Sequence, residues 1–128
     1  MLTRSIIAAL FLFGATASAL SETVQAPADR ARQWLVLVDD KNYAQSWSET
    51  AKAFQNRRTA DTWASDATAR RAPLGAVASR DLKSIDLSRG NAAVVRFDTV
   101  FAHKAAVVET ITLVFENGSW SVTDYSVD

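Results

Sequence analysis

Apolar residues recur at helical spacing shortly after residue 28. Ala31, Trp34, Leu35 and Val38 fall at positions i, i+3, i+4 and i+7, which places all four on one face of an α-helix. The polar residues 39–42 interrupt this stripe, and an Asp or Asn side chain there can cap a following helix. The pattern therefore predicts a first core-facing helix that ends near residue 39.

Two further helices are expected before residue 73. The second helix is indicated by an aromatic or small residue at every fourth position: Tyr43, Trp47 and Ala51. Arg57-Arg58 reads as a connector, and Thr59 is a suitable N-cap for a third helix that contains Trp63 and Ala67. That helix should stop before Pro73, because proline disfavours helical geometry in the residue that precedes it.

After Gly75 the hydrophobic period changes from helical to alternating and stays so to the end. The expected strands are Val77–Leu87, Ala93–Phe101, Val107–Glu116 and Trp120–Val127. The expected connections are Ser88–Asn91, Ala102–Ala105 and Asn117-Gly118, the last being typical of a type I′ hairpin turn. An odd interval after Leu82 indicates a β-bulge in the first strand. Helices followed by a meander predict an α+β fold, with about three helices covering one face of a curved four-stranded antiparallel sheet.

The first nineteen residues have the three parts of a secretory signal. Arg4 provides the positive charge, residues 6–13 form an unbroken apolar run, and Ala17-Ser18-Ala19 is a small-x-small cleavage pattern. The apolar run is shorter than the roughly 20 residues that a membrane span needs. We expect a signal peptide over residues 1–19 cleaved after Ala19, a flexible leader over 20–27 and a single domain over 28–128. The domain would then be periplasmic or secreted, with no stable membrane anchor after signal removal.

Composition narrows the function classes. The chain contains no cysteine, which excludes disulfides, lipid attachment through cysteine and thiolate metal sites. Its 14 basic and 14 acidic residues balance, so nothing favours binding to nucleic acid or to an anionic membrane. Hydrophobic residues make up 48% of the chain, which is ordinary for a globular domain. The sequence indicates no metal site and no cofactor.

Several short segments, taken together, resemble a known family. They are Ala31–Leu35 with Asp39, the Tyr43…Trp47 pair, Arg71–Gly75, Ser79-Arg80, Phe97–Thr99, Glu109-Thr110, and the closing Gly118…Trp120–Val122…Tyr125. On these residues the sequence is similar to the small exported proteins called domain of unknown function 4019. The resemblance covers nearly the whole mature chain. It implies a cone of the nuclear transport factor 2-like or cystatin-like kind, and it implies no particular activity, because that fold hosts many functions.

Glu109 is the residue that most invites a chemical role. Alternation puts its carboxylate on the same face as Ile111 and Leu113, towards the helices, where an unpaired charge is costly. One interpretation makes it an acid/base or ligand anchor at the mouth of a pocket, and the other makes it an ion-paired strut at the margin of the sheet. The candidate partners are Arg80, Lys83, Arg96 and Lys104.

Other candidates have two interpretations as well. His103, the single histidine, lies in a predicted connector without supporting carboxylates and is expected to be exposed. The tryptophans Trp34, Trp47, Trp63 and Trp120 either pack in the core or line a cavity. The pairs Arg57-Arg58 and Arg70-Arg71 either form an anion-binding patch with Arg80 or make solvated ion pairs with nearby aspartates.

The leading functional hypothesis is a non-catalytic domain that binds a small molecule or a protein partner on the open side of its sheet. The residues expected to line that site are Trp34, Trp47, Arg80, Phe97, Glu109 and Ile111. One alternative is a small-molecule enzyme, a hydrolase or an isomerase or lyase, with Glu109 as acid/base assisted by Arg80 or His103. Another is a homodimeric assembly module whose outer sheet face carries Thr110, Thr112, Val114 and Tyr125.

Overall fold

The computed structural model describes residues 15–128, with side chains from residue 26 onward. The helices are α1 (Ala15–Asp39), α2 (Tyr43–Ser48), α3 (Lys52–Arg57) and α4 (Ala60–Arg71). The strands are β1 (Val77–Arg89), β2 (Ala92–Phe101), β3 (Lys104–Glu116) and β4 (Ser119–Val127). Most of the expected signal peptide, residues 1–14, lies outside the described residues.

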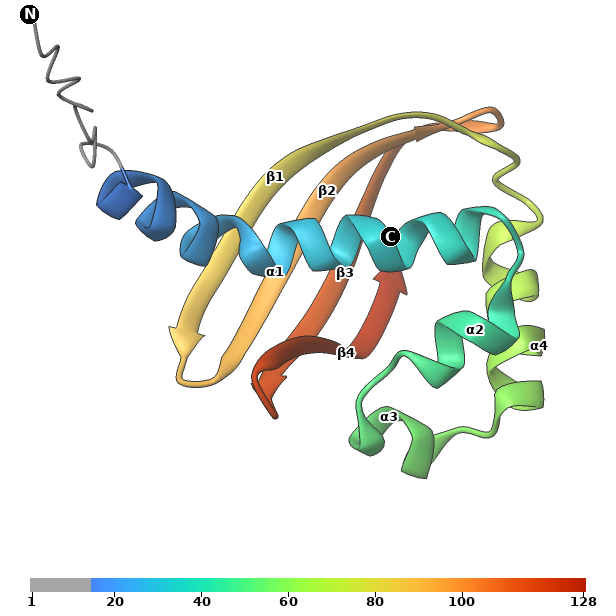
Figure 1. Ribbon diagram of the computed structural model, residues 1–128. Helices are drawn as coiled ribbons and strands as arrows, with labels where there is room; N and C mark the ends of the chain where they lie inside the picture. The colour runs from blue at the N-terminus through green and yellow to red at the C-terminus, as the bar shows by residue number, and fades with distance from the viewer. Residues whose placement is uncertain (1–14) are drawn as a thin grey trace, which may run out of the picture.

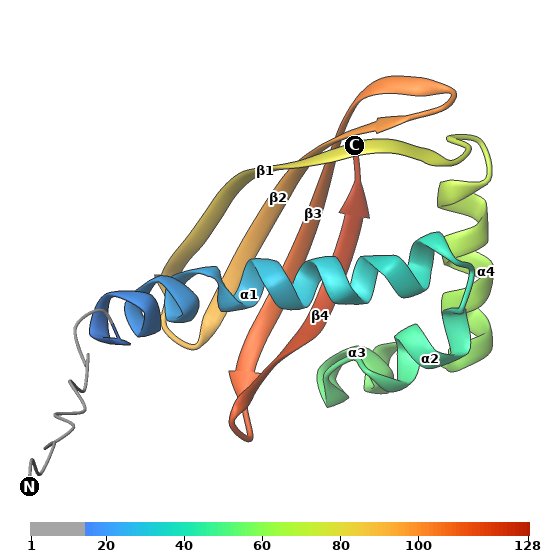
Figure 2. The same cartoon turned by 45° about the horizontal axis from the view of Figure 1, so that its top comes forward.

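The four strands form one antiparallel sheet in the order β1-β2-β3-β4, so each strand pairs with its neighbour in the sequence. Helix α1 lies across one face of this sheet, and α2, α3 and α4 gather beside its C-terminal half (Figure 1). The view in Figure 2 shows the same arrangement, with the sheet curving over α1. The expected α+β class, with helices preceding a four-stranded antiparallel sheet, is confirmed, and the sheet is open.

The core forms where α1 meets the middle strands. The four residues of the predicted stripe on α1 are all buried, with at most 1% of their surface exposed. They pack against the inward-facing residues of β2 and β3: Val95, Phe97, Ile111 and Leu113. Burying a large apolar side chain contributes about 1.5–3 kcal/mol, so this contact is the main reason that α1 stays on the sheet.

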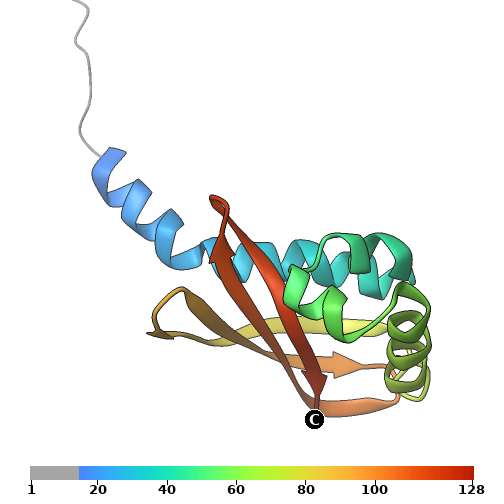
Figure 3. The same ribbon diagram turned by 90° about the horizontal axis from the view of Figure 1, so that it is seen from below.

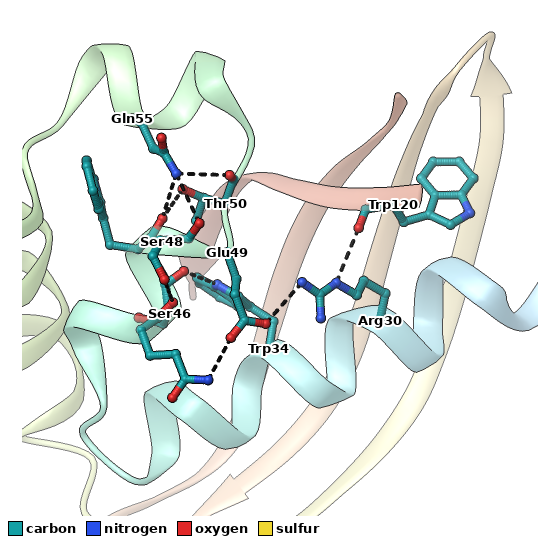
Figure 4. Close-up of polar contacts among 10 residues, drawn as sticks. Arg30, Trp34, Ser46, Ser48, Glu49, Thr50, Gln55 and Trp120 are labelled. Atoms are coloured by element: carbon teal, nitrogen blue, oxygen red, sulfur yellow. Dashed lines mark hydrogen bonds and ion pairs between the residues drawn. The ribbon is translucent and has the colours of Figure 1, made fainter. Parts of the chain in front are cut away.

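Polar contacts join α1 to the short helices and to β4 (Figure 4). The indole Nε1 of Trp34 donates to the backbone oxygen of Ser46 at 2.9 Å. Arg30 donates through Nη2 to Glu49 at 3.2 Å and through Nε to the backbone oxygen of Trp120 at 3.2 Å. These contacts hold the polypeptide between α2 and α3 against both α1 and the sheet.

Two expectations about the helices were wrong. Residues 20–27, expected to be a flexible leader, belong to α1, which begins at Ala15 and contains Pro27. An apolar stripe reveals only the part of a helix that packs on a core, and the predicted stripe begins at Ala31. The second predicted helix is also two helices, α2 and α3. They are separated where Thr50 bridges to Val122 and the amide of Ala51 donates to the Val122 oxygen at 2.8 Å.

Two expectations about the strands also need correction. The connector expected over residues 102–105 is a two-residue turn, because β3 starts at Lys104 and pairs with Phe101. Tyr125, expected on the outer face, is buried in the core with 1% exposure. The β3–β4 register shifts between Thr112/Asp124 and Leu113/Val122, so Thr123 is an extra residue. This bulge turns Val122 and Tyr125 to the same face.

The bulge predicted in β1 is confirmed, since the β1–β2 register shifts between Leu82 and Ser84. Figure 3 shows the result for the sheet as a whole, in which β4 is turned strongly relative to β1. Bulges increase local twist. Because the sheet is twisted, its ends lie farther from α1 than its middle does (Figure 3). The end of the sheet next to α4 is where the polar residues described below collect.

Candidate functional site

Glu109 is fully buried, and its carboxylate is completely hydrogen-bonded. Its Oε1 accepts from Nε of Arg80 at 2.7 Å and from the hydroxyl of Thr99 at 2.6 Å. Its Oε2 accepts from the hydroxyl of Tyr125 at 2.6 Å. Of the four cations considered as partners, Arg80 is therefore the one that pairs with Glu109.

Arg80 reaches Glu109 because of the sheet register. Arg80 on β1 is the cross-strand partner of Thr99 on β2, and Glu109 on β3 is the partner of Phe97, two residues along on the same face. The three polar side chains therefore meet on the helix-covered face of the sheet. Burial alone would lower the pKa of Arg80, but its hydrogen bonds to Asp39 and Glu109 and their negative charges outweigh that effect and raise it.

The same guanidinium holds Asp39, the last residue of α1. Nη1 of Arg80 donates to Oδ2 of Asp39 at 2.8 Å, and Nη2 donates to Oδ1 at 3.0 Å. A carboxylate is unfavourable at a helix C-terminus, where the helix dipole is negative. Burial of Asp39 would by itself raise its pKa, yet hydrogen bonds and charge from Arg80 and Arg71 outweigh burial and hold the pKa below its usual value.

Arg71, the last residue of α4, completes the group. Its Nη2 donates to Oδ1 of Asp39 at 2.6 Å, and its guanidinium carbon lies 4.9 Å from the centre of the Phe101 ring. Such stacking of a cation on an aromatic face is favourable. We call Asp39, Arg71, Arg80 and Glu109 the ionic network. Two carboxylates balance two guanidinium groups, so the network is neutral.

Tyr125 is fixed as a hydrogen-bond donor to this network. Its burial, together with the charge of Glu109 and the hydrogen bond to it, raises the pKa of the phenol well above its usual value. The hydroxyl therefore keeps its proton and donates to Glu109 at any ordinary pH. This contact exists because the bulge at Thr123 turns Tyr125 inward.

A pocket of about 550 Å³ lies beside the ionic network. It is formed by the C-terminal end of α1, the C-terminal end of α4, the start of β1 and one residue of α2. Its lining residues are Val38, Asp39, Lys41, Tyr43, Thr68, Arg71, Ala72, Gly75, Ala76 and Val77. We call it the α1–α4 pocket. Asp39 and Arg71 belong to both the pocket and the network, whereas Arg80 and Glu109 do not line the pocket.

The residues expected to line a ligand site lie elsewhere. Trp34, Phe97 and Ile111 are fully buried in the core. Trp47 is partly buried and donates its Nε1 to the backbone oxygen of Arg58 at 2.8 Å. None of the six expected residues lines the α1–α4 pocket. Their positions follow from the fold, because α1 fills the space over the inward face of the sheet.

The remaining candidates are separated in the structure. His103 is exposed in the turn between β2 and β3, where its ring lies close to Gly75. Arg70 donates to the backbone oxygen of Tyr125 at 2.9 Å, and Arg58 lies 3.7 Å from Asp66. Arg58 and Arg70 therefore make contacts of their own, whereas Arg71 shares Asp39 with Arg80. The arginines do not gather in one anion-binding patch.

The sequence interpretation overlooked Asp39 and Lys41 as site residues. Residues 39–42 were expected to end the first helix and to cap the second, and Asp39 was one of the residues that carry the family resemblance. The sequence does contain an indication that Asp39 has a cationic partner, because an aspartate in the last turn of a helix is unfavourable unless a cation lies near it. Among the residues that the structure describes, no three His, Asp or Glu side chains come together in a way that could hold a metal ion. Within the same part of the chain, no helix is both long and apolar enough to span a membrane.

The fold and the network define a class, an α+β domain with helices packed on an open four-stranded antiparallel sheet and a buried ionic network at one end. The family model described as protein of unknown function (DUF4019) matches residues 30–125. The chain belongs to this family. A search of curated proteins found no match to the sequence.

Proposed function

We propose that this chain is an exported, non-catalytic domain that binds a small molecule in the α1–α4 pocket. The main observation behind the proposal is that the pocket is separate from most of the ionic network. Asp39 and Arg71 line the pocket, whereas Arg80 and Glu109 do not. The pocket is about 550 Å³, within the range of small-molecule sites, and its lining combines apolar residues with a few polar ones. Export is supported by the signal-like pattern of residues 1–19.

The contacts of Glu109 favour binding over acid/base catalysis. A general acid or base must reach the substrate at hydrogen-bond distance. Both oxygens of Glu109 instead accept hydrogen bonds from the protein, its side chain has no exposed surface, and it does not line the pocket. Arg80 is likewise occupied by Asp39 and Glu109.

We also infer that the fold is a cone of the nuclear transport factor 2-like or cystatin-like kind. The support is the curved sheet with a long helix laid across its inner face (Figures 1 and 2). A cone of this kind leaves one end of the sheet less covered than the other. The α1–α4 pocket lies at such an end, where the C-terminal residues of α1 and α4 line it.

Pocket filling tests the binding function. Ala72 is exposed and lines the pocket, so Ala72→Phe should occupy it without disturbing the core. Ala69 is exposed in the last turn of α4, which Ala72 directly follows, and it does not line the pocket. Ala69→Phe is therefore the matched control. Native mass spectrometry of protein purified from the periplasm of an expressing bacterium should find a co-purified small molecule in wild type and in Ala69→Phe. The expected result is its loss in Ala72→Phe, and equal retention in both variants would contradict the proposal.

Export has its own test. Mass spectrometry of the periplasmic protein should give a mature chain that begins at Leu20, because the predicted cleavage follows Ala19. Replacing Ala19 with a bulky residue should cause the uncleaved precursor to accumulate. Recovery of the full-length chain in the cytoplasm would contradict the proposed location.

A further inference from the structure

Arg71 has hydrogen-bonding capacity that the protein does not use. A guanidinium carries five N–H donors, and within the described part of the chain this one makes a single hydrogen bond, from Nη2 to Asp39. Among the described residues, Nε and Nη1 have no acceptor although both are buried. The residue is 8% exposed and lines the α1–α4 pocket. Leaving buried donors without an acceptor is unfavourable, so this arrangement favours binding of a ligand that supplies one.

The network contains no acceptor that could serve Arg71 better. Oδ1 of Asp39 already accepts from both arginines, and Oδ2 accepts from Arg80. Both oxygens of Glu109 are used by Arg80, Thr99 and Tyr125. The described residues therefore offer Arg71 no further acceptor, and a ligand bound in the pocket would supply one.

The charge of the pocket favours a negative ligand. The ionic network is neutral by itself, and Lys41 adds a further positive charge to the lining. Lys41 makes no ion pair with any residue in the part of the chain that the structure describes. A carboxylate fits the planar fork of a guanidinium and makes stronger hydrogen bonds to it than a neutral acceptor does.

The remaining lining residues indicate what kind of group the rest of the ligand carries. Val38, Tyr43, Ala72, Ala76 and Val77 present mainly apolar surface. We propose that the α1–α4 pocket binds a small organic carboxylate with an apolar body, and that Arg71 is the residue that anchors its carboxylate. This inference rests on the proposed binding function and specifies its ligand class. Nε and Nη1 are covered by protein, so the proposal includes a small rotation of the guanidinium towards the pocket on binding.

Arg71 can be replaced without dismantling the network. Asp39 keeps both of its contacts to Arg80 when Arg71 is absent. Arg71→Gln is therefore the test variant, and Arg71→Lys is a second one that keeps the charge. The matched control is Arg58→Gln. Arg58 also stacks on a phenylalanine, at 5.3 Å from the Phe54 ring, and has an unsatisfied Nη1, but it does not line the pocket.

The test compares acids with their neutral primary amides, using octanoate with octanamide and 2-naphthoate with 2-naphthamide. Calorimetric and NMR titrations of wild type should give binding of at least one acid that is about tenfold tighter than that of its amide, since a carboxylate makes stronger hydrogen bonds to a guanidinium than a neutral amide does. Arg71→Gln should bring the ratio close to one, Arg71→Lys should leave an intermediate ratio, and Arg58→Gln should not change it.

The outcomes separate this inference from the binding function. Equal binding of acid and amide, abolished by Ala72→Phe, would overturn the carboxylate assignment and leave the binding function intact. A preference for the acid that survives in folded Arg71→Gln would overturn Arg71 as the anchor. Absence of binding by all four compounds would count against both proposals. The acid-to-amide ratio in wild type decides the ligand class even if Arg71→Gln fails to fold.

Discussion

Nε of Arg80 donates to Oε1 of Glu109 at 2.7 Å, and this contact joins β1 to β3 across the intervening strand. The carboxylate is fully buried and the guanidinium side chain is 11% exposed. A buried ion pair is weak evidence of net stabilisation, but removal of one partner leaves an uncompensated charge in the interior. Replacing either Arg80 or Glu109 alone should therefore destabilise the folded protein.

Glu109→Gln should destabilise the domain strongly. The amide leaves Arg80 with Asp39 alone, and the cost of breaking a buried pair is about 3–5 kcal/mol. Chemical denaturation followed by circular dichroism measures the change. Glu116→Gln is the control, because Glu116 is exposed near the end of the same strand and should change stability by no more than about 0.5 kcal/mol. Equal stability of Glu109→Gln and wild type would show that the pair is dispensable.

Asp39 should make the stability of the protein depend on acidity. Its pKa is lower in the folded state than the ordinary value of 3.8, so the folded state binds fewer protons than the unfolded state. The resulting stabilisation is fully present above pH 3.8 and is lost as the pH falls through the folded pKa. The difference in unfolding free energy between wild type and Asp39→Asn should therefore shrink below about pH 4.

Denaturant titrations between neutral and acid pH check this behaviour. Asp40→Asn is the control, because Asp40 is the next residue and is exposed. Asp40→Asn should stay within about 0.5 kcal/mol of wild type, as is usual for an exposed substitution. A difference between wild type and Asp39→Asn that grows on acidification would reverse the assigned sign of the pKa shift.

The sequence predicts those features best whose interacting residues lie close together along the chain. The stripe on α1, the Thr59 cap and the bulge after Leu82 follow from local spacing, and all three are present. The hydroxyl of Thr59 accepts from the amide of Thr62 at 3.1 Å, as a capping residue does. Local rules describe these features well because the interacting groups lie within a few residues of each other.

The candidate site is harder to predict from such local rules. The strand face of Glu109 pointed to a site residue, and Arg71 was a candidate for an anion-binding patch. The pairing of Arg71 with Asp39 was not predicted, because it joins residues 32 positions apart. Tyr125 was placed outside because strict alternation assumes that no residue is inserted, and the bulge at Thr123 breaks that assumption. A one-residue change of register moves a side chain to the opposite face, so a single bulge decided whether Glu109 had a third partner.

Ser46 should be more important for stability than its size indicates. It is fully buried, its hydroxyl accepts from Nε1 of Trp63 at 2.9 Å, and it donates to the backbone oxygen of Tyr43 at 2.8 Å. Ser46→Ala would leave the indole N–H without a partner, at a cost of about 1–3 kcal/mol. Thermal and chemical unfolding measure the loss.

Ser48 on the same helix provides the comparison. Its hydroxyl makes an exposed bond of the same kind, to the backbone oxygen of Gln45 at 2.8 Å. Ser48→Ala should stay within about 0.5 kcal/mol of wild type. Similar losses in the two variants would mean that the serine-to-backbone bond within α2, which both residues make, determines the effect, and not the bond to Trp63.

Gly75 is expected to tolerate no side chain, for two separable reasons. Its φ of 76° lies in the left-handed region, and a Cβ added there would lie 2.7 Å from Cδ2 of His103. Gly118 has a similar φ of 80° with no atom within 4 Å of the equivalent Cβ. Gly118→Ala should therefore cost only the backbone strain, about 1 kcal/mol, whereas Gly75→Ala should cost about 1–3 kcal/mol more because of overpacking.

A double-mutant cycle with His103→Ala isolates the steric part. Removing the imidazole should recover most of the additional loss in Gly75→Ala, because the nearest atoms to the added Cβ belong to that ring. The Ala102 Cβ, at 3.1 Å, and the φ strain would remain in the double variant. Unfolding free energies that add without coupling would show that the turn between β2 and β3 moves aside, and that His103 does not fix the position of Gly75 at the pocket.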